Sequence, residues 1–268
     1  MVGIYDSGLG GLTVFKAIQE RQIFSNFVYL ADTANAPYGE KTHDQVFEYS
    51  VRVIDFLFKK GCTLVIVACN TASAGALRKI QSEWLPEYYP DKKVLGVIIP
   101  TAEAVCDISK FNKSRVGVIG TSLTINSGKY EQEIKKINPE LEVFSQATPL
   151  LVEIIEAGDE RASLTKEILK NYLQPLLDKN IDILVLGCTH YPFLEQEIKK
   201  IIGNKIVIVN SPENIAVKLE EYIKKHQILL DKKTKKEIFY VTGDEKKFKL
   251  LGEKFLGREI NNPIKIRL

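Results

Sequence analysis

Two aliphatic segments that each run into a cysteine constrain this chain more than any other feature of its sequence. Residues 64–67 form an aliphatic run that leads through one small residue to Cys69, and residues 183–186 lead in the same way to Cys188. Continuous runs of this kind are typical of buried strands in parallel sheets. We therefore expect each thiol at the carboxyl end of a parallel strand, where α/β sheets bind their ligands.

The two cysteine segments belong to a longer internal repeat. Residues 116–122 repeat the pattern of strand, small residue and hydroxyl found in residues 2–8, and residues 205–212 correspond to an expected strand over residues 94–99 that ends before Pro100. A repeat of this length indicates two similar domains and not a solenoid. We expect an α/β fold: two similar doubly wound parallel-sheet domains related by the repeat, with the active site in the cleft between them.

The chain after residue 212 is longer than the second copy of the repeat needs. It predicts a helix from residue 213 to about residue 227, a strand over residues 238–242 and a helix over residues 245–255. We infer that this tail returns to complete the first sheet. The expected domains are then residues 1–98 plus 212–268 and residues 99–211, with Cys69 and Cys188 facing each other across the cleft.

The composition excludes several classes of partner. The chain has 37 basic and 34 acidic residues, so its net charge of +3 leaves no footprint for nucleic-acid binding. Lysines crowd residues 224–249, but acidic residues lie between them, which favours a solvated helical face. No transmembrane run or signal peptide is found, and four widely spaced cysteines favour reduced thiols. We expect a cytoplasmic homodimer that binds neither nucleic acid nor a membrane.

Two thiols on opposite sides of one carbon atom suit a two-base racemisation. One group removes a proton from one face of the carbon while the other delivers a proton to the opposite face. Two equivalent groups are what a duplicated fold provides. Cysteine is suitable because its pKa, about 8.5, is lowered by a helix N-terminus or a polar neighbour.

The order of the motifs also resembles the glutamate racemase family across essentially the whole chain. The matching segments are Asp6-Ser7-Gly8, Gly10-Gly11-Leu12-Thr13, Pro37-Tyr38-Gly39, Cys69-Asn70-Thr71-Ala72 and Gly187-Cys188-Thr189-His190-Tyr191-Pro192. The resemblance implies an enzyme that needs no cofactor and no metal, interconverts L- and D-glutamate, and supplies the D-isomer for bacterial peptidoglycan. Because only Met1 precedes the first expected strand, we expect no activator site built from an N-terminal extension.

The resemblance implies roles for individual residues. Cys69 is expected to act on D-glutamate and Cys188 on L-glutamate, with Asp6 assisting the first thiol and His190 the second. An acidic residue of a Glu-Glu-Gly-like segment corresponds to Glu156, although the next residue here is alanine. The substrate-binding positions that match are Asp6, Ser7, Tyr38, Gly39, Asn70, Thr71, Thr189 and His190.

The motifs contain no arginine for the two carboxylates of glutamate. Hydroxyl groups, an amide and backbone N–H groups at helix starts are sufficient donors for anions. On this argument we add Thr121 and Thr124 to the expected donors. Closure of a hinge between the domains would exclude water while a carbanion forms.

Other readings of the same residues remain open. Cys62 and Cys106 are expected to be buried fillers, and a zinc site at Cys69, Cys188 and His190 lacks the usual spacing of ligands. The glycines after Asp6 do not complete a dinucleotide-binding motif. The alternative functions are aspartate racemisation, a Cys-His amidase or hydrolase, and a binding module without catalysis.

Overall fold

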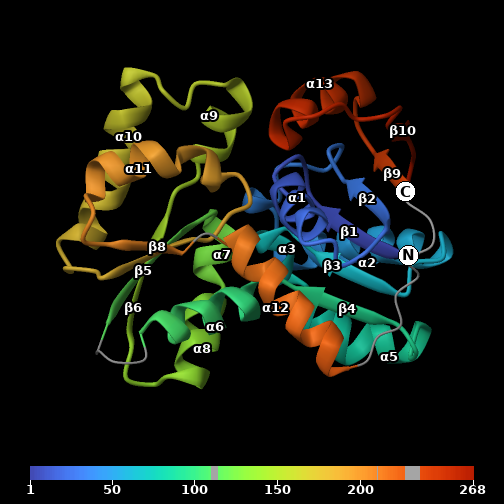
Figure 1. The fold of residues 1–268 in the computed structure, drawn as a ribbon, viewed down its shortest axis with the longest axis horizontal. Coiled ribbons are helices and arrows are strands. Elements are labelled where there is room, and N and C mark those ends of the chain that lie inside the picture. Colours follow the sequence, from blue (N-terminus) through green and yellow to red (C-terminus); the bar gives the residue numbers. More distant parts are fainter. Residues whose placement is uncertain (110–113, 210, 227–235) are drawn as a thin grey trace.

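Two parallel sheets form the framework of the protein, seen in a computed structural model that describes residues 1–109, 114–209, 211–226 and 236–268 (Figure 1). The first sheet has the strand order β10-β9-β2-β1-β3-β4 and the second the order β6-β5-β7-β8. Every pairing in both sheets is parallel. The strands are β1 (Val2–Asp6), β2 (Asn26–Ala31), β3 (Leu64–Val67), β4 (Lys93–Gly96), β5 (Arg115–Gly120), β6 (Glu142–Ala147), β7 (Ile183–Leu186), β8 (Val207–Val209), β9 (Lys236–Val241) and β10 (Ile264–Lys265).

Helices connect consecutive strands and cover the two sheets (Figure 1). The α-helices are α1 (Leu12–Glu20), α2 (His43–Lys59), α3 (Asn70–Gly75), α4 (Leu77–Lys79), α5 (Leu85–Tyr88), α6 (Ile98–Ile108), α7 (Ser122–Asn126), α8 (Lys129–Ile137), α9 (Leu151–Ala157), α10 (Ser163–Leu177), α11 (Glu195–Ile202), α12 (Ser211–Lys225) and α13 (Glu245–Leu256). The remaining helical segments are the 3₁₀-helices η1 (Tyr38–Glu40) and η3 (Tyr191–Leu194) and the π-helix η2 (Ile80–Trp84). Within the described residues, none of these helices has the length and apolar character that crossing a bilayer requires.

The internal repeat is visible in the strand order. Strands β2-β1-β3-β4 of the first sheet correspond one to one with β6-β5-β7-β8 of the second. The hydrogen bonds repeat as well, because Ala68 donates its N–H to the Tyr5 carbonyl and Gly187 donates to the Ile119 carbonyl, both at 2.8 Å. The prediction of two similar α/β domains with parallel sheets is confirmed.

The tail of the chain adds two strands to the first sheet. β9 pairs along its whole length with β2, and β10 pairs with β9. Helix α12 precedes them and packs against both α1 and α6. We retain residues 1–98 plus 212–268 and residues 99–211 as a proposed division into domains. Residue 210 and, within the lysine-rich region, Lys232, Lys233 and Lys235 lie outside the described residues.

The strand expected over residues 94–99 is shorter than predicted. β4 ends at Gly96 and α6 begins at Ile98, so Pro100 lies in the first turn of a helix and does not follow a strand. Proline is tolerated there because the first N–H groups of a helix have no partner within the helix. The same reason applies to Pro212, since α12 begins at Ser211.

A hydrophobic core crosses from one sheet to the other. One cluster of buried side chains includes Ile4 and Ile66 of the first sheet together with Leu184 and Leu186 of the second. Burying a side chain of this size contributes about 1.5–3 kcal/mol. The two sheets therefore share part of their stabilising core. Cys62 and Cys106 are buried and unpaired, as expected of apolar fillers.

Candidate active site

A cavity of about 240 Å³ lies where the carboxyl ends of both sheets meet. Cys69 follows β3 and Cys188 follows β7, and both thiols line this cavity while being only 5% and 7% exposed. The other predicted site residues that line it are Ser7, Tyr38, Gly39, Asn70, Thr71, Thr121, Glu156, Thr189 and His190. The fold thus brings together side chains from both copies of the repeat.

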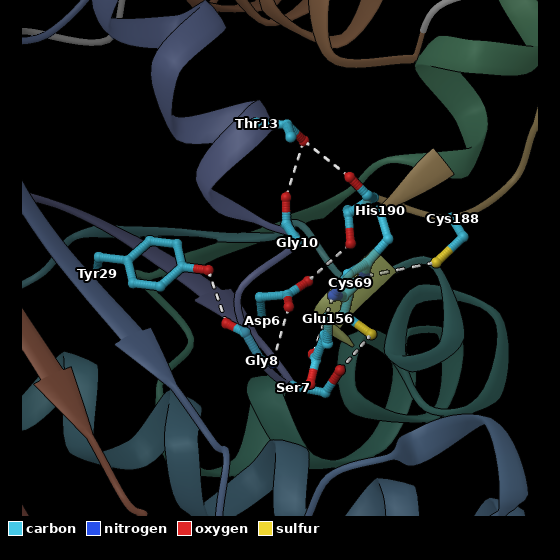
Figure 2. Close-up of polar contacts among 11 residues, drawn as sticks. Asp6, Ser7, Gly8, Gly10, Thr13, Tyr29, Cys69, Glu156, Cys188 and His190 are labelled. Atoms are coloured by element: carbon cyan, nitrogen blue, oxygen red, sulfur yellow. Dashed lines mark hydrogen bonds and ion pairs between the residues drawn. The ribbon is translucent and has the colours of Figure 1, made fainter. Parts of the chain in front are cut away.

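Cys69 lies at the N-terminus of α3, where its sulfur accepts a hydrogen bond from the Ala72 N–H at 3.5 Å. The Ser7 hydroxyl is 3.4 Å from the same sulfur (Figure 2). Burial, and next the charge of Asp6, raise the pKa of Cys69 to about 12, while the contacts with Ser7 and Ala72 lower it. At neutral pH Cys69 is therefore a thiol, with donors already placed to hold a thiolate.

Cys188 belongs to a chain of three polar side chains. Its sulfur is 3.8 Å from Nδ1 of His190, and Nε2 of His190 is 3.2 Å from Oε1 of Glu156 (Figure 2). Burial alone lowers the pKa of His190, but the contacts with Cys188 and Glu156 outweigh it and raise the pKa to about 10. The hydrogen bond from His190 lowers the pKa of Glu156. At neutral pH the imidazole is a cation next to the Cys188 sulfur.

Asp6 lies behind the cavity and not in its lining. Its carboxylate accepts hydrogen bonds from the Gly8 N–H at 2.8 Å and from the Thr189 hydroxyl at 3.4 Å. Burial raises its pKa, although these contacts and the charge of His190 oppose that effect. Asp6 is thus placed to act on the cavity through its charge and through Thr189, because no direct contact with Cys69 is found in the described structure.

Three threonine hydroxyls form a cluster between the two units. Thr71 is 2.9 Å from Thr121, and Thr121 is 3.0 Å from Thr124. Thr71 belongs to α3 and the other two to the start of α7, so the cluster joins the two copies of the repeat. Thr124 lies behind the first two and does not line the cavity. Its expected role as a donor to substrate is therefore indirect.

Tyr38 lines the cavity, while its hydroxyl is hydrogen-bonded to two other side chains. The hydroxyl donates to Asp32 at 2.6 Å and accepts from Tyr5 at 3.0 Å. Gly39 follows in close contact with α7, since a Cβ there would be 2.8 Å from Cβ of Thr121. The loop after β2 can approach α7 only because residue 39 has no side chain.

Sequence reasoning missed Lys247, which lines the cavity from α13. The sequence predicts a solvated helical face for the lysines of this region, and no local pattern distinguishes Lys247 from Lys246. Only the return of the tail to the first sheet brings it to the mouth of the cavity. Glu153, one turn before Glu156 on α9, also lines the cavity and was missed because it belongs to none of the motifs. Among the described residues, no group of three or more His, Cys, Asp and Glu side chains is arranged to hold a metal ion.

Comparison with known proteins assigns the chain to a family. Residues 15–218 match the Asp/Glu/Hydantoin racemase family, and the chain belongs to it. Within that family it is similar to glutamate racemases. The glutamate racemase of Corynebacterium diphtheriae is 37% identical over 97% of this chain and 96% of its own length.

Solved structures agree with this assignment. A glutamate racemase isoform of Bacillus anthracis superposes with a TM-score of 0.92 at 35% identity, covering 100% of this chain and 97% of the other. The glutamate racemase of Francisella tularensis, solved in complex with D-glutamate, gives a TM-score of 0.89 at 32% identity over 99% and 97% of the two chains. The predicted resemblance to glutamate racemases, and the prediction of an enzyme of this type, are confirmed.

Proposed function

We propose that this protein interconverts L- and D-glutamate by a two-base mechanism in which Cys69 and Cys188 are the bases and no cofactor takes part. The observation that carries the proposal is the pair of buried thiols, which follow corresponding strands of two sheets and line one cavity. The similarity to glutamate racemases supports the choice of glutamate.

The reaction balances without an added reactant. A thiolate on one side takes the proton from Cα, and the electron pair of the broken C–H bond stays on the carbon as a carbanion. The thiol on the other side then gives its proton to the opposite face of that carbon. The substrate leaves with inverted configuration, and thiol and thiolate have exchanged places.

The surroundings of each sulfur support a charge on it. For Cys188, the cationic imidazole of His190 is the neighbouring donor, and Glu156 orients that ring. For Cys69, the donors are the Ser7 hydroxyl and the Ala72 N–H at the start of α3. In keeping with the family resemblance, Cys69 acts on the D-isomer and Cys188 on the L-isomer.

The lining of the cavity offers groups for a small dicarboxylate. The cavity that holds the thiols is also lined by residues with hydroxyl or amide groups, namely Ser7, Asn70, Thr71, Thr121 and Thr189. Lys247 at the mouth supplies a cation opposite the acidic side chains of Glu153 and Glu156. Donors around the α-carboxylate stabilise the carbanion as it forms.

The test is loss of optical activity of L-glutamate in D₂O, followed by circular dichroism, with mass analysis of deuterium at Cα. The parent protein should racemise glutamate and incorporate solvent deuterium, whereas Cys69→Ser and Cys188→Ser should each lose about 10³-fold in kcat/KM in both directions. Cys62→Ala and Cys106→Ala, which remove thiols remote from the cavity, serve as matched controls.

Other substrates test the competing functions. Racemisation of L-aspartate under the same conditions would indicate an aspartate racemase. Release of ammonia from glutamine would indicate an amidase. Near-full turnover in both directions by a variant with one of the two cysteines replaced would contradict the two-base mechanism. An unchanged optical signal with the parent protein would contradict racemisation itself.

The resemblance extends the proposal to a cellular role. D-glutamate made by this reaction would supply peptidoglycan synthesis, and the enzyme would act in the cytoplasm. Its assembly as a homodimer stays a prediction, which sedimentation of the purified protein tests.

A further inference from the structure

We propose that Tyr130 is a positioning residue that sets the orientation of the Asn70 amide and joins the two cysteine-bearing strand ends. The inference rests on the proposed racemisation and adds a residue outside the motifs. Tyr130 lies on α8 of the second unit, whereas Asn70 is the first residue of α3 in the first unit (Figure 1).

The contact with the first cysteine segment is a buried hydrogen bond. The Tyr130 hydroxyl donates to Oδ1 of Asn70 at 2.6 Å, and both side chains are 2% exposed. Asn70 directly follows Cys69 and lines the cavity, while Tyr130 is absent from the lining. Tyr130 therefore acts on the site through Asn70.

The contact with the second cysteine segment is made by the ring. A Cβ on Gly187 would lie 3.1 Å from Cε2 of Tyr130 and 2.6 Å from the Ile119 carbonyl oxygen. The ring thus packs against the residue that precedes Cys188, in space that a side chain at residue 187 would occupy. One side chain touches the neighbours of both thiols, and its position fixes how the two strand ends face each other.

The second amide atom of Asn70 provides an independent observation. Nδ2 of Asn70 is buried and has no hydrogen-bond partner among the described residues. Within the part of the chain that the structure describes, it is the one buried side-chain nitrogen or oxygen atom without such a partner. Buried donors without a partner are rare in native proteins and call for an explanation. Because Tyr130 holds Oδ1, Nδ2 is the amide atom left for another acceptor, and a substrate carboxylate bound in the adjoining cavity would be that acceptor.

Loss of the Tyr130 hydroxyl removes the preference between the two orientations of this amide. A side-chain amide that turns by half a rotation presents oxygen where it previously presented N–H groups. An oxygen facing the substrate carboxylate repels it. The hydroxyl therefore acts on binding and on carbanion stabilisation, and the ring acts on the spacing of the strands.

The experiment is a double-mutant cycle with Tyr130→Phe, Asn70→Ala and both together. Tyr130→Phe keeps the ring and should lower kcat/KM for both isomers about tenfold. In the Asn70→Ala background the same change should cost less than twofold, because its target is gone. Tyr89→Phe, which removes a hydroxyl bonded to Asp55 at 2.6 Å remote from the cavity, is the matched control.

A readout that does not depend on activity accompanies the cycle. In protein labelled with nitrogen-15, the side-chain amide resonances of Asn70, assigned by their loss in Asn70→Ala, should shift in Tyr130→Phe and not in Tyr89→Phe. Unshifted resonances, an activity within twofold of the parent, or an equal loss in both backgrounds would each overturn the proposal. A parent protein that does not racemise glutamate overturns the proposed function instead, and the amide resonances still decide the role of Tyr130.

Discussion

The two thiols of the site have unlike neighbours, although they occupy corresponding positions in the repeat. Cys69 has a neutral hydroxyl and a helix N–H, whereas Cys188 has a cationic imidazole held by Glu156. The repeat therefore specifies where the sulfur atoms lie but not which donors lie next to each of them. Substitutions next to one thiol should have effects with a different pH dependence from substitutions next to the other.

Glu156→Gln should move the alkaline limit of activity to lower pH. The carboxylate contact is one of the interactions that raise the pKa of His190 to about 10, so without it the imidazole loses its proton at lower pH. The pH profile of kcat/KM from about pH 6 to pH 10 measures this shift. An alkaline limb that coincides with that of the parent would show that the charge of His190 is not required.

The same substitution should change the pH dependence of stability. His190 has an ordinary pKa of 6.5, so its contribution is fully present below pH 6.5 and is lost as the pH rises through about 10. The contribution of Glu156 is present above its ordinary pKa of 4.5 and is lost as the pH falls through its lowered value. Glu156→Gln should therefore cost about 1 kcal/mol near pH 5–6 and almost nothing near pH 10.5, as measured by urea unfolding.

Gly10→Ala should displace the groups next to the second thiol. A Cβ at residue 10 would overlap Oγ1 of Thr189 and lie 2.5 Å from Nδ1 of His190. Because real Cβ atoms do not approach so closely, the loop or the imidazole must move. We expect a loss of more than 100-fold in kcat/KM and about 1–3 kcal/mol of stability, from kinetics and urea unfolding. Gly203→Ala adds a Cβ that meets nothing within 4 Å, but its φ of +74° strains any side chain; it therefore controls for loss of stability remote from the site and should leave kcat/KM unchanged.

Single residues could be predicted from the sequence where they follow strand ends. Cys69 and Cys188 line the cavity because the ends of parallel strands meet there. Asp6 also ends a strand, yet it lies behind the lining, because the Gly8 N–H and the Thr189 hydroxyl hold its carboxylate. The orientation of the Asp6 side chain depends in part on Thr189, which is distant in sequence, so no local pattern predicts it.

Among the elements, α13 links the tail of the chain to the site. Lys247 reaches the mouth of the cavity from this helix, and the ring of Phe255 packs against His190 with centroids 5.7 Å apart. Lys254 on the same helix pairs with Glu160 of the second unit at 3.3 Å. The helix thus connects the first unit to the side of the site that carries Cys188.

Lys247→Met should weaken the binding of glutamate. The lysine cation offsets the charges of Glu153 and Glu156 at the mouth, so its removal leaves an acidic rim that repels a dicarboxylate. KM should rise about three- to tenfold with a smaller change in kcat, and the difference from the parent should shrink at high salt. Lys246→Met, exposed on the same helix and outside the lining, should leave KM unchanged; an equal effect of the two substitutions would count against the role of Lys247.

The elements themselves were predictable where the apolar pattern is long. The aliphatic runs before the two cysteines are strands, as expected, whereas the run after Lys93 divides between β4 and α6. An apolar run is equally compatible with a buried strand and with a buried helix start. The packing of Gly96 against Leu77 and Ser73, which fixes the end of β4, is tertiary information.

On the scale of the whole molecule, the two sheets are joined by a common core. The cluster that contains Ile66 and Leu184 extends over both units, while two further clusters lie mainly in one unit each, so part of the core of each unit is shared. The correspondence between the two sheets was predictable from the repeat. The sharing of a core was not, because it depends on how α1, α12 and α13 pack between the units.

Unfolding should therefore be a single cooperative transition. Trp84, the one tryptophan of the chain, packs against the core of the first unit, so its fluorescence reports on that unit, while far-ultraviolet circular dichroism reports on both. The two signals should give the same urea midpoint within error. Two separated midpoints would show that the units unfold independently.

The two thiols have different neighbours, yet thermodynamics requires the same kcat/KM for the forward and the reverse reaction. Enantiomers have the same free energy in water, so an enzyme that interconverts them must have equal values of kcat/KM in the two directions. A change confined to the Ser7 and Cys69 side must therefore slow both directions by the same factor in kcat/KM. The values of kcat and KM for L-glutamate can each differ from those for D-glutamate. The size of that difference measures how differently the site binds the two isomers.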